Sequence, residues 1–250
     1  GSGEFRESTW DEATALIADR MRVAIDSKGP DAVVAFTYNS SAATIERASL
    51  TEAFFAAIGA TICEHTICAH TMGVSWDSVF GDMASADPLD VVNSKLVVIW
   101  GANPTVSNTH FPPLVQRAVA NGAKVVVIDP RRIDLVDDAV CHLAIRPGTN
   151  VALLNAMAHT IVTEGLCDRE FLASRVEDVQ AFREFVETWP PSRAADICEV
   201  DAEAIRRAAR TYAGHGPAMT VHGLGLTEHV QGTDGVMALI NLALLTGNLG

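Results

Sequence analysis

Short apolar runs alternate with helix-like segments through the middle of this 250-residue chain. Leu96–Trp100 and Lys124–Ile128 are apolar at nearly every position, and a third short run covers 141–145. Between the first two, residues 111–121 carry apolar side chains at helical spacing. Strands that are apolar throughout and alternate with helices are typical of a parallel sheet covered on both faces. The pattern predicts an α/β fold with Rossmann-like parallel sheets flanked by helices.

The rest of the chain continues this alternation. Thr9 and Glu12 form a capping-box pattern that opens an amphipathic helix. Further strands are predicted at 32–38, 60–62 and Ala218–His222, and further helices at 42–58, 151–164, 168–186, 201–213 and 235–245. Residues 63–88 and the neighbourhood of Pro190 and Pro191 show no period, so we expect irregular loops there.

Composition narrows the classes of partner. The chain has 31 acidic and 18 basic residues and a net charge of −13, which argues against a nucleic-acid partner. No apolar run approaches the roughly 20 residues that a membrane helix needs, and no signal peptide is recognisable. Five scattered cysteines do not suggest a disulfide framework. A cytoplasmic location is therefore expected.

Polar residues directly follow the three central strands. They are Gly101 and Asn103 after the first, Asp129, Pro130 and Arg131 after the second, and Gly148, Thr149 and Asn150 after the third. Ligands of open parallel sheets bind outside the carboxyl ends of the strands, where a carboxylate can bind ribose hydroxyls. Asn, Asp and Pro are also ordinary turn formers. Three such turns on consecutive strands favour a nucleotide-type site, although neither a dinucleotide glycine fingerprint nor a Walker pattern accompanies them.

Cys63, His65, Cys68 and His70 form the densest cluster of soft metal ligands. Three interpretations stay open at this point. The four could bind zinc, although the spacing is poor for a structural zinc site. They could be a buried thiol with surface histidines. One thiolate could also ligate a metal held mainly by another group, and soft thiolate suits molybdenum, tungsten, copper or iron.

Six segments together resemble the molybdopterin oxidoreductases of the dimethyl sulfoxide reductase family. They are W-G-x-N-P at 100–104, G-A-K-V-V-V-I-D-P-R at 122–131, R-P-G-T-N at 146–150, A-L-L-N-A-M at 152–157, G-L-G-L-T-E-H at 223–229 and N-L-A-L-L-T-G-N-L-G at 241–250. The resemblance covers residues 6–250, and among subfamilies it is strongest to formate dehydrogenase catalytic subunits.

The resemblance implies a molybdenum or tungsten centre held by two molybdopterin guanine dinucleotides, with Cys68 as the metal ligand and His70 as a candidate proton carrier. The residues that match the cofactor-binding loops are Gly101, Asn103, Asp129, Pro130, Arg131, Gly148, Thr149, Asn150, Gly223, Gly225, Thr227 and Glu228. The chain departs from the family pattern at three positions: Asn150 replaces a frequent Asp, Glu228 a frequent Gln, and Ala69 the histidine of formate dehydrogenases.

The resemblance also implies a division of the chain and a function. Residues 1–5 are expected to be a cloning remnant, 6–66 half of one Rossmann-like domain, and 67–250 a domain that binds the guanine dinucleotide. The parent protein would perform two-electron redox chemistry on a small substrate such as formate, with a [4Fe-4S] cluster outside this stretch and an electron-transfer subunit or redox protein as partner. The stretch alone is expected to be inactive. The alternative is a nucleotide- or pterin-binding or interaction module without catalysis.

Overall fold

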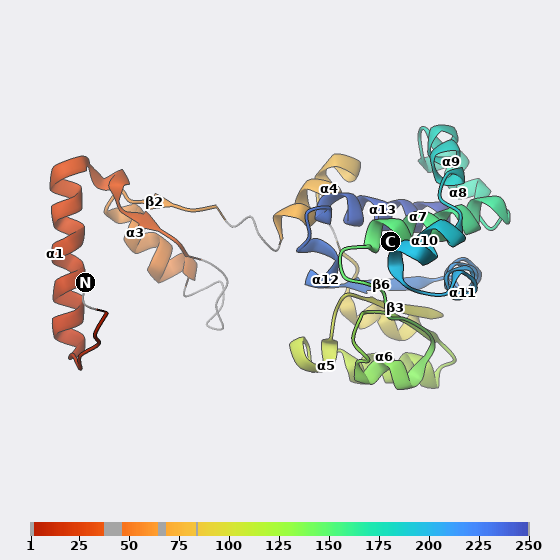
Figure 1. Cartoon of the computed structure of the whole chain (residues 1–250), viewed down its shortest axis with the longest axis horizontal. Coiled ribbons are helices and arrows are strands. Elements are labelled where there is room, and N and C mark those ends of the chain that lie inside the picture. The colour runs from red at the N-terminus through yellow and green to blue at the C-terminus, as the bar shows by residue number, and fades with distance from the viewer. Residues whose placement is uncertain (1–2, 38–46, 65–68, 84, 250) are drawn as a thin grey trace. The chain divides into compact units, whose positions relative to one another are not determined.

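A computed structural model of the chain describes residues 3–37, 47–64, 69–83 and 85–249. The chain forms two compact units, Gly1–Thr66 and Ile67–Gly250. Figure 1 labels their helices and strands. Each unit is described by itself.

The first unit is a small βαβ arrangement. Helix α1 (Trp10–Lys28) begins after Thr9, whose Oγ1 accepts a hydrogen bond from the backbone N–H of Glu12 at 3.2 Å, as the sequence predicted. A 3₁₀ turn (Pro30–Ala32), β1 (Val34–Ala35), a π-helical turn (Arg47–Glu52), α3 (Ala53–Ala57) and β2 (Thr61–Ile62) follow. The two strands pair in parallel. Both are shorter than predicted, and the start of the predicted helix at 42–58 lies outside the described residues.

The second unit is built on a four-stranded parallel sheet with the strand order β5-β4-β3-β6. Its strands are β3 (Leu96–Trp100), β4 (Lys124–Ile128), β5 (Ala139–Leu143) and β6 (Ala218–His222). Three of the four have the predicted bounds. The fourth, β5, begins and ends two residues earlier than predicted, because its pairing with β4 runs from Ala139 to Leu143.

Helices and 3₁₀ turns connect these strands. Their bounds are α4 (His70–Phe80), η3 (Pro88–Asn93), α5 (Pro104–Ser107), α6 (Pro112–Ala120), η4 (Asp134–Asp138), α7 (Asn150–Thr163), α8 (Arg169–Arg175), α9 (Val179–Glu187), α10 (Pro191–Cys198), α11 (Ala202–Gly214), α12 (Leu224–Thr227) and α13 (Gly232–Leu245).

Two of these helices correct the sequence interpretation. Residues 63–88 were expected to form an irregular loop, but α4 occupies the middle of that stretch and packs Met72 and Trp76 against the core. A loop was also expected around Pro190 and Pro191, yet α10 begins at Pro191. Proline is tolerated at the first helical position because its missing N–H would have had no partner there. The proline pair therefore marks a helix start.

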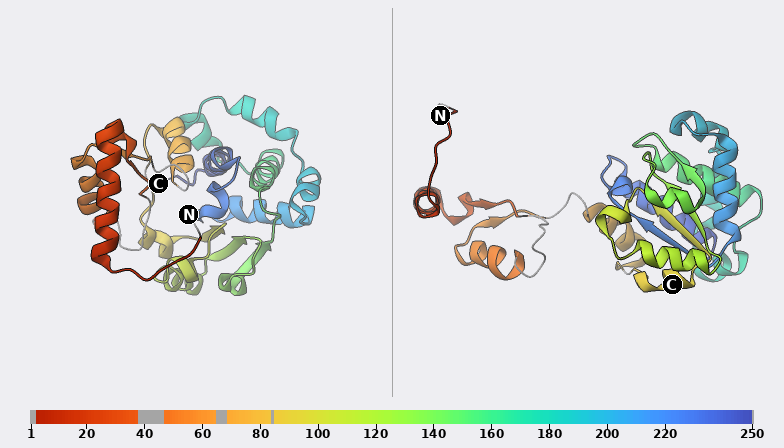
Figure 2. Two further views of the ribbon diagram at one scale, coloured as in Figure 1. Left: turned by 60° about the vertical axis from the view of Figure 1, so that its left-hand side comes forward. Right: turned by 90° about the horizontal axis from the view of Figure 1, so that it is seen from below.

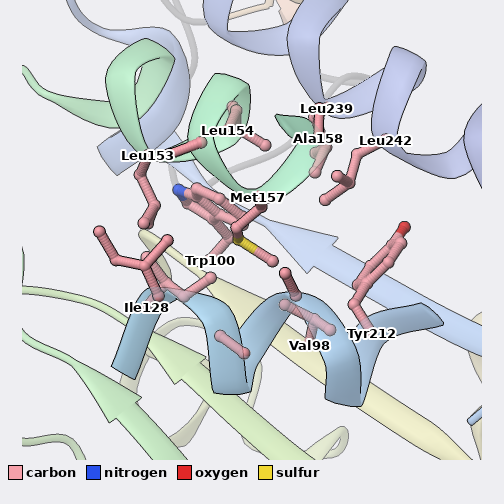
Figure 3. Packing of buried hydrophobic residues seen from close by; sticks show 14 of the residues in the cluster. Val98, Trp100, Ile128, Leu153, Leu154, Met157, Ala158, Tyr212, Leu239 and Leu242 are labelled. Atoms are coloured by element: carbon pink, nitrogen blue, oxygen red, sulfur yellow. The ribbon is translucent and has the colours of Figure 1, made fainter. Parts of the chain in front are cut away.

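Both faces of the four-stranded sheet are buried. Val98 and Trp100 of β3 pack with residues of α7, α11 and α13, whereas Val97 and Ile99 pack with α6. Helix α6 lies on one side of the sheet and α7 and α13 on the other in Figure 1, and Figure 2 gives two further directions. Figure 3 shows Trp100 and Met157 in the middle of the larger cluster. The predicted fold class, parallel sheets flanked by helices, is confirmed.

None of the helices in the described ranges combines the length and the apolar character that would be needed to cross a bilayer.

Candidate functional site

The turns that follow the strands meet at the carboxyl edge of the four-stranded sheet. Backbone N–H groups just beyond the strand ends continue the ladder: Gly101 donates to Ile128 at 2.8 Å, and Gly223 donates to Trp100 at 3.0 Å. The N–H of Asp129 donates to the Leu143 carbonyl at 3.2 Å. The first residues of three predicted cofactor loops therefore lie side by side at one edge.

Three glycines let the loops after β3 and β6 cross in direct backbone contact. The Gly225 N–H donates to the carbonyl of Gly101 at 3.0 Å, and Gly101 has a φ of +56°. A Cβ added to Gly225 would lie 2.7 Å from the Cα of Gly101, and one added to Gly223 would lie 2.7 Å from the Gly101 carbonyl oxygen. Side chains do not fit at such distances, so the crossing requires glycine.

Asn150 ties three elements together behind this crossing. It is the first residue of α7 and is only 6% exposed. Its Oδ1 accepts a hydrogen bond from the Trp100 indole Nε1–H at 2.8 Å, and its Nδ2 donates to the Gly225 carbonyl at 3.0 Å. Trp100 ends β3, and Gly225 belongs to the loop after β6. The amide that was predicted to contact a ligand is thus engaged in fixing the two loops.

Asp129 is held in a turn by its own backbone neighbours. One carboxylate oxygen, Oδ1, accepts a hydrogen bond from the Arg131 backbone N–H at 2.8 Å. The Asp129 carbonyl accepts a second from His142 Nε2 at 2.9 Å. Pro130 and the side chain of Arg131 are exposed. The other carboxylate oxygen has no hydrogen bond to a described residue.

Four buried side-chain atoms near the carboxyl ends of β3 and β6 have no hydrogen-bond partner among the described residues. They are Asn103 Oδ1, Thr105 Oγ1, His222 Nδ1 and Thr227 Oγ1. Buried polar atoms are normally bonded, so each of these four needs a partner such as a water molecule, an ion or a ligand group. Burial lowers the pKa of His222, and a backbone hydrogen bond at Gly223 opposes this. His222 therefore stays neutral near pH 7.

Sequence reasoning singled out Asn103 and Thr227 but missed Thr105 and His222. Thr105 is two residues beyond Asn103, and His222 is the last residue of β6. The signal was present, since both are polar residues at the carboxyl end of an apolar strand or in the turn after it. His222 is the clearer omission, because a histidine in an otherwise mostly apolar strand has to be satisfied somehow.

The loop before α7 is fixed from within. Thr149 is 8% exposed, and its hydroxyl donates to the Arg146 carbonyl at 2.6 Å. The Cys198 thiol donates to the Thr149 carbonyl at 3.5 Å. Gly148 has a φ of +86° and is exposed, and a Cβ built there would meet nothing within 4 Å. Conformation, not crowding, is what favours glycine at this position.

Of the two residues predicted to act at the metal, one is described. Cys68 lies outside the described residues, as does His65 of the same cluster. His70 is the first residue of α4 and is exposed. Its neighbour Thr71 donates a hydrogen bond to the Thr227 carbonyl at 3.4 Å, so the start of α4 lies beside the loop after β6. Glu228 in that loop is exposed.

Within the described ranges, no three His, Cys, Asp or Glu side chains are grouped so that they could hold a metal ion. Cys63, the first member of the predicted cluster, belongs to the first unit, whereas His70 belongs to the second.

Comparison with known proteins gives concordant matches. A family model described as molybdopterin oxidoreductase matches residues 1–250. Formate dehydrogenase H of Escherichia coli is 37% identical over 99% of this chain and 35% of its own length. The F420-dependent formate dehydrogenase subunit alpha of Methanocaldococcus jannaschii is 33% identical over 98% of this chain and 36% of its own length. The chain thus spans about a third of these relatives.

One solved structure supports the fold. Acetylene hydratase from Pelobacter acetylenicus superposes with a TM-score of 0.74 over 100% of this chain and 34% of its own, at 23% identity.

Proposed function

Because the chain belongs to the molybdopterin oxidoreductase family, whose cofactor is a molybdenum or tungsten molybdopterin, we propose that the carboxyl edge of its four-stranded sheet binds the guanine dinucleotide end of that cofactor. In the whole protein, this cofactor would supply two-electron redox chemistry on a small substrate. Formate is the favoured substrate, because the relatives at 37%, 33% and 32% identity are all formate dehydrogenases.

The observation that carries the proposal is the group of unpartnered buried atoms at this edge. Asn103 Oδ1 can only accept a hydrogen bond, so a ligand N–H or O–H would satisfy it. Thr227 Oγ1 can donate or accept, which suits either a hydroxyl or a phosphate oxygen. The fold alone would not require either atom to stay unpaired, whereas a bound nucleotide would pair both.

The neighbouring charges fit a nucleotide as well. The oxygen of Asp129 that no described residue bonds is available for a ribose hydroxyl, as acidic residues after strands are in dinucleotide folds. The side chain of Arg131, two residues further along the chain, is exposed, and its guanidinium can bind phosphate oxygens by paired hydrogen bonds. The glycine crossing of Gly101, Gly223 and Gly225 holds the segments after β3 and β6 together at this edge.

Asn150 takes a different role in this proposal from the one the family motif implied. Its Oδ1 and one of its N–H groups already bond Trp100 and Gly225, so we assign it the positioning of the two loops, and not the recognition of guanine. Family members often have Asp at this position. The hydrogen bonds that Asn150 makes to Trp100 and Gly225 hold the loops without the negative charge of an Asp.

Cys68 and His70 complete the proposal on the strength of the motif. Cys68 would supply the protein thiolate to the metal, and the exposed His70 would carry the substrate proton to solvent. A redox protein or electron-transfer subunit would take up the electrons. The mutations that separate these roles from cofactor binding are Cys68→Ser and His70→Gln in the full-length, metal-loaded protein. Both should abolish or slow formate-dependent dye reduction without changing nucleotide binding.

Nucleotide binding is tested on the chain itself. GDP in a hundredfold excess over its Kd should raise the Tm by roughly 5–10 °C, since the ligand then contributes about 2.7 kcal/mol. ADP should stabilise it much less. Asp129→Asn and Asn103→Leu should each weaken GDP binding, measured by calorimetry, by about tenfold or more.

The matched control is Asp196→Asn, which removes the same charge from an exposed position on α10 and should leave GDP affinity unchanged. Equal stabilisation by ADP, or none by either nucleotide, would overturn the assignment of this edge to a guanine dinucleotide.

A further inference from the structure

A second cluster of polar groups lies away from the carboxyl edge, in a cavity of about 610 Å³ between the end of α7 and helices α8 and α9. Apolar side chains, Leu172 and Val176 among them, line it together with Arg169, Gln180 and Arg183. The volume falls in the range of small-molecule sites, about 300–1,000 Å³. The pocket is open to solvent, and polar and apolar groups both contribute to its lining.

Arg183 is half-buried in this pocket, and one atom of its guanidinium is shielded from solvent. The Nε of Arg183 is buried and has no hydrogen-bond partner among the described residues. None of the ion pairs that the described carboxylates form involves Arg183 or Arg169. The chain has 31 acidic and only 18 basic residues, yet two arginines and no carboxylate line this pocket. A buried N–H without an acceptor is also costly.

The remaining polar neighbour does not supply the missing charge. The Cys167 thiol lies next to Arg183; burial raises the pKa of this thiol, and Arg183 opposes that shift. The thiol is therefore neutral near pH 7 and does not compensate the guanidinium. No described residue supplies an acceptor for the buried Nε, so a molecule from solution can supply one.

We propose that this cavity binds a small monocarboxylate with an apolar chain. Its carboxylate would accept hydrogen bonds from Arg183 and Arg169, and its hydrocarbon would lie against Leu172 and Val176. The site is independent of the cofactor edge, because no residue that lines it belongs to the loops that follow the four strands.

Octanoate is the probe, and calorimetric titration of the whole chain is the measurement. One molecule of octanoate should bind per chain. Octanol, which lacks the charge, and acetate, which lacks the chain, should each bind at least about tenfold more weakly. Arg183→Gln should weaken octanoate binding about tenfold. Arg169→Gln, at an exposed position at the start of α8, gives a second variant in case Arg183→Gln does not fold.

Arg117→Gln is the matched control, since it removes a positive charge from the exposed side of α6 and should leave octanoate affinity unchanged. Absence of octanoate binding, binding as tight as that of acetate, or equal weakening by Arg117→Gln would each overturn the proposal. GDP stabilisation should persist in all three arginine variants, so failure here is distinguishable from failure of the cofactor site.

Discussion

Strands and helices alternate in both compact units, but only in the second unit are their apolar side chains largely buried. In the first unit, each strand has two residues, Ala35 is the one described residue that is fully buried, and Leu16 and Ile17 on α1 remain 57% and 59% exposed. In the second, all five residues of β3 are buried. Two short strands give a helix no broad surface to cover, whereas four strands offer two faces. Apolar periodicity therefore predicts the element, and the number of strands decides whether it forms a core.

The two units should differ most in the free energy of unfolding that is lost when one leucine in each is replaced by alanine. Leu153 of α7 is fully buried, so Leu153→Ala should lower the free energy of unfolding by about 2–5 kcal/mol. Leu16→Ala on α1 should change it by less than about 0.5 kcal/mol. Urea denaturation followed by circular dichroism measures both. Similar losses for the two variants would mean that the first unit has a core equal to that of the second.

The glycine crossing gives the next effect. Gly225→Ala places a Cβ against the Gly101 backbone, where no flexible side chain can move aside, and should cost about 2–4 kcal/mol. Gly214→Ala is the control, because a Cβ at that position at the end of α11 meets nothing within 4 Å and alanine favours helix. Thermal unfolding should show a lower Tm for the first variant and an unchanged or slightly higher one for the second. An unchanged Tm for Gly225→Ala would contradict the close crossing.

The smallest effect compares one helix cap in each unit. Asp201 accepts a hydrogen bond from the Ala204 N–H at 2.8 Å and caps α11, which buries Ile205 and Tyr212. Asp201→Ala should therefore cost about 1 kcal/mol and lower the Tm of the second unit by about 2–4 °C. Thr9→Ala removes the equivalent bond from α1, which has no buried residue. Its effect should stay local.

Amide hydrogen exchange separates the two cap variants. Thr9→Ala should speed exchange in the first turns of α1 only, and Asp201→Ala should speed it throughout the second unit when exchange requires global unfolding. Equal, local effects in both would show that α11 is no better integrated than α1.

Much of the second unit could be predicted from sequence because its signals are local. The strands Leu96–Trp100, Lys124–Ile128 and Ala218–His222 are mostly apolar runs, and each has the predicted bounds. The polar turns after them were expected to meet, because parallel strands all end at the same edge. The family followed from motifs spread over the chain, and it is confirmed.

The rest depends on contacts between distant residues. Helix α4 was missed although Met72, Trp76 and Phe80 recur at a spacing of four residues, because the glycine and serines between them weaken the helical pattern. The role of Asn150 could not be inferred because its partners, Trp100 and Gly225, are far away along the chain. The cavity beside Arg183 likewise depends on how two short helices pack. No pattern of spacing encodes such pairings.

The strand order β5-β4-β3-β6 has a consequence for how the chain folds. The central strand β3 acquires its second neighbour only when β6 arrives, and in sequence the two are separated by most of the second unit. Until then β3 has an open edge of unpaired backbone groups, which can recruit foreign strands. Pairings of such high contact order are slow to form. A chain that ends before Ala218 should therefore aggregate during refolding. Because β6 is the last strand along the chain, the edge of β3 stays unpaired until β6 has been synthesised and has paired with it.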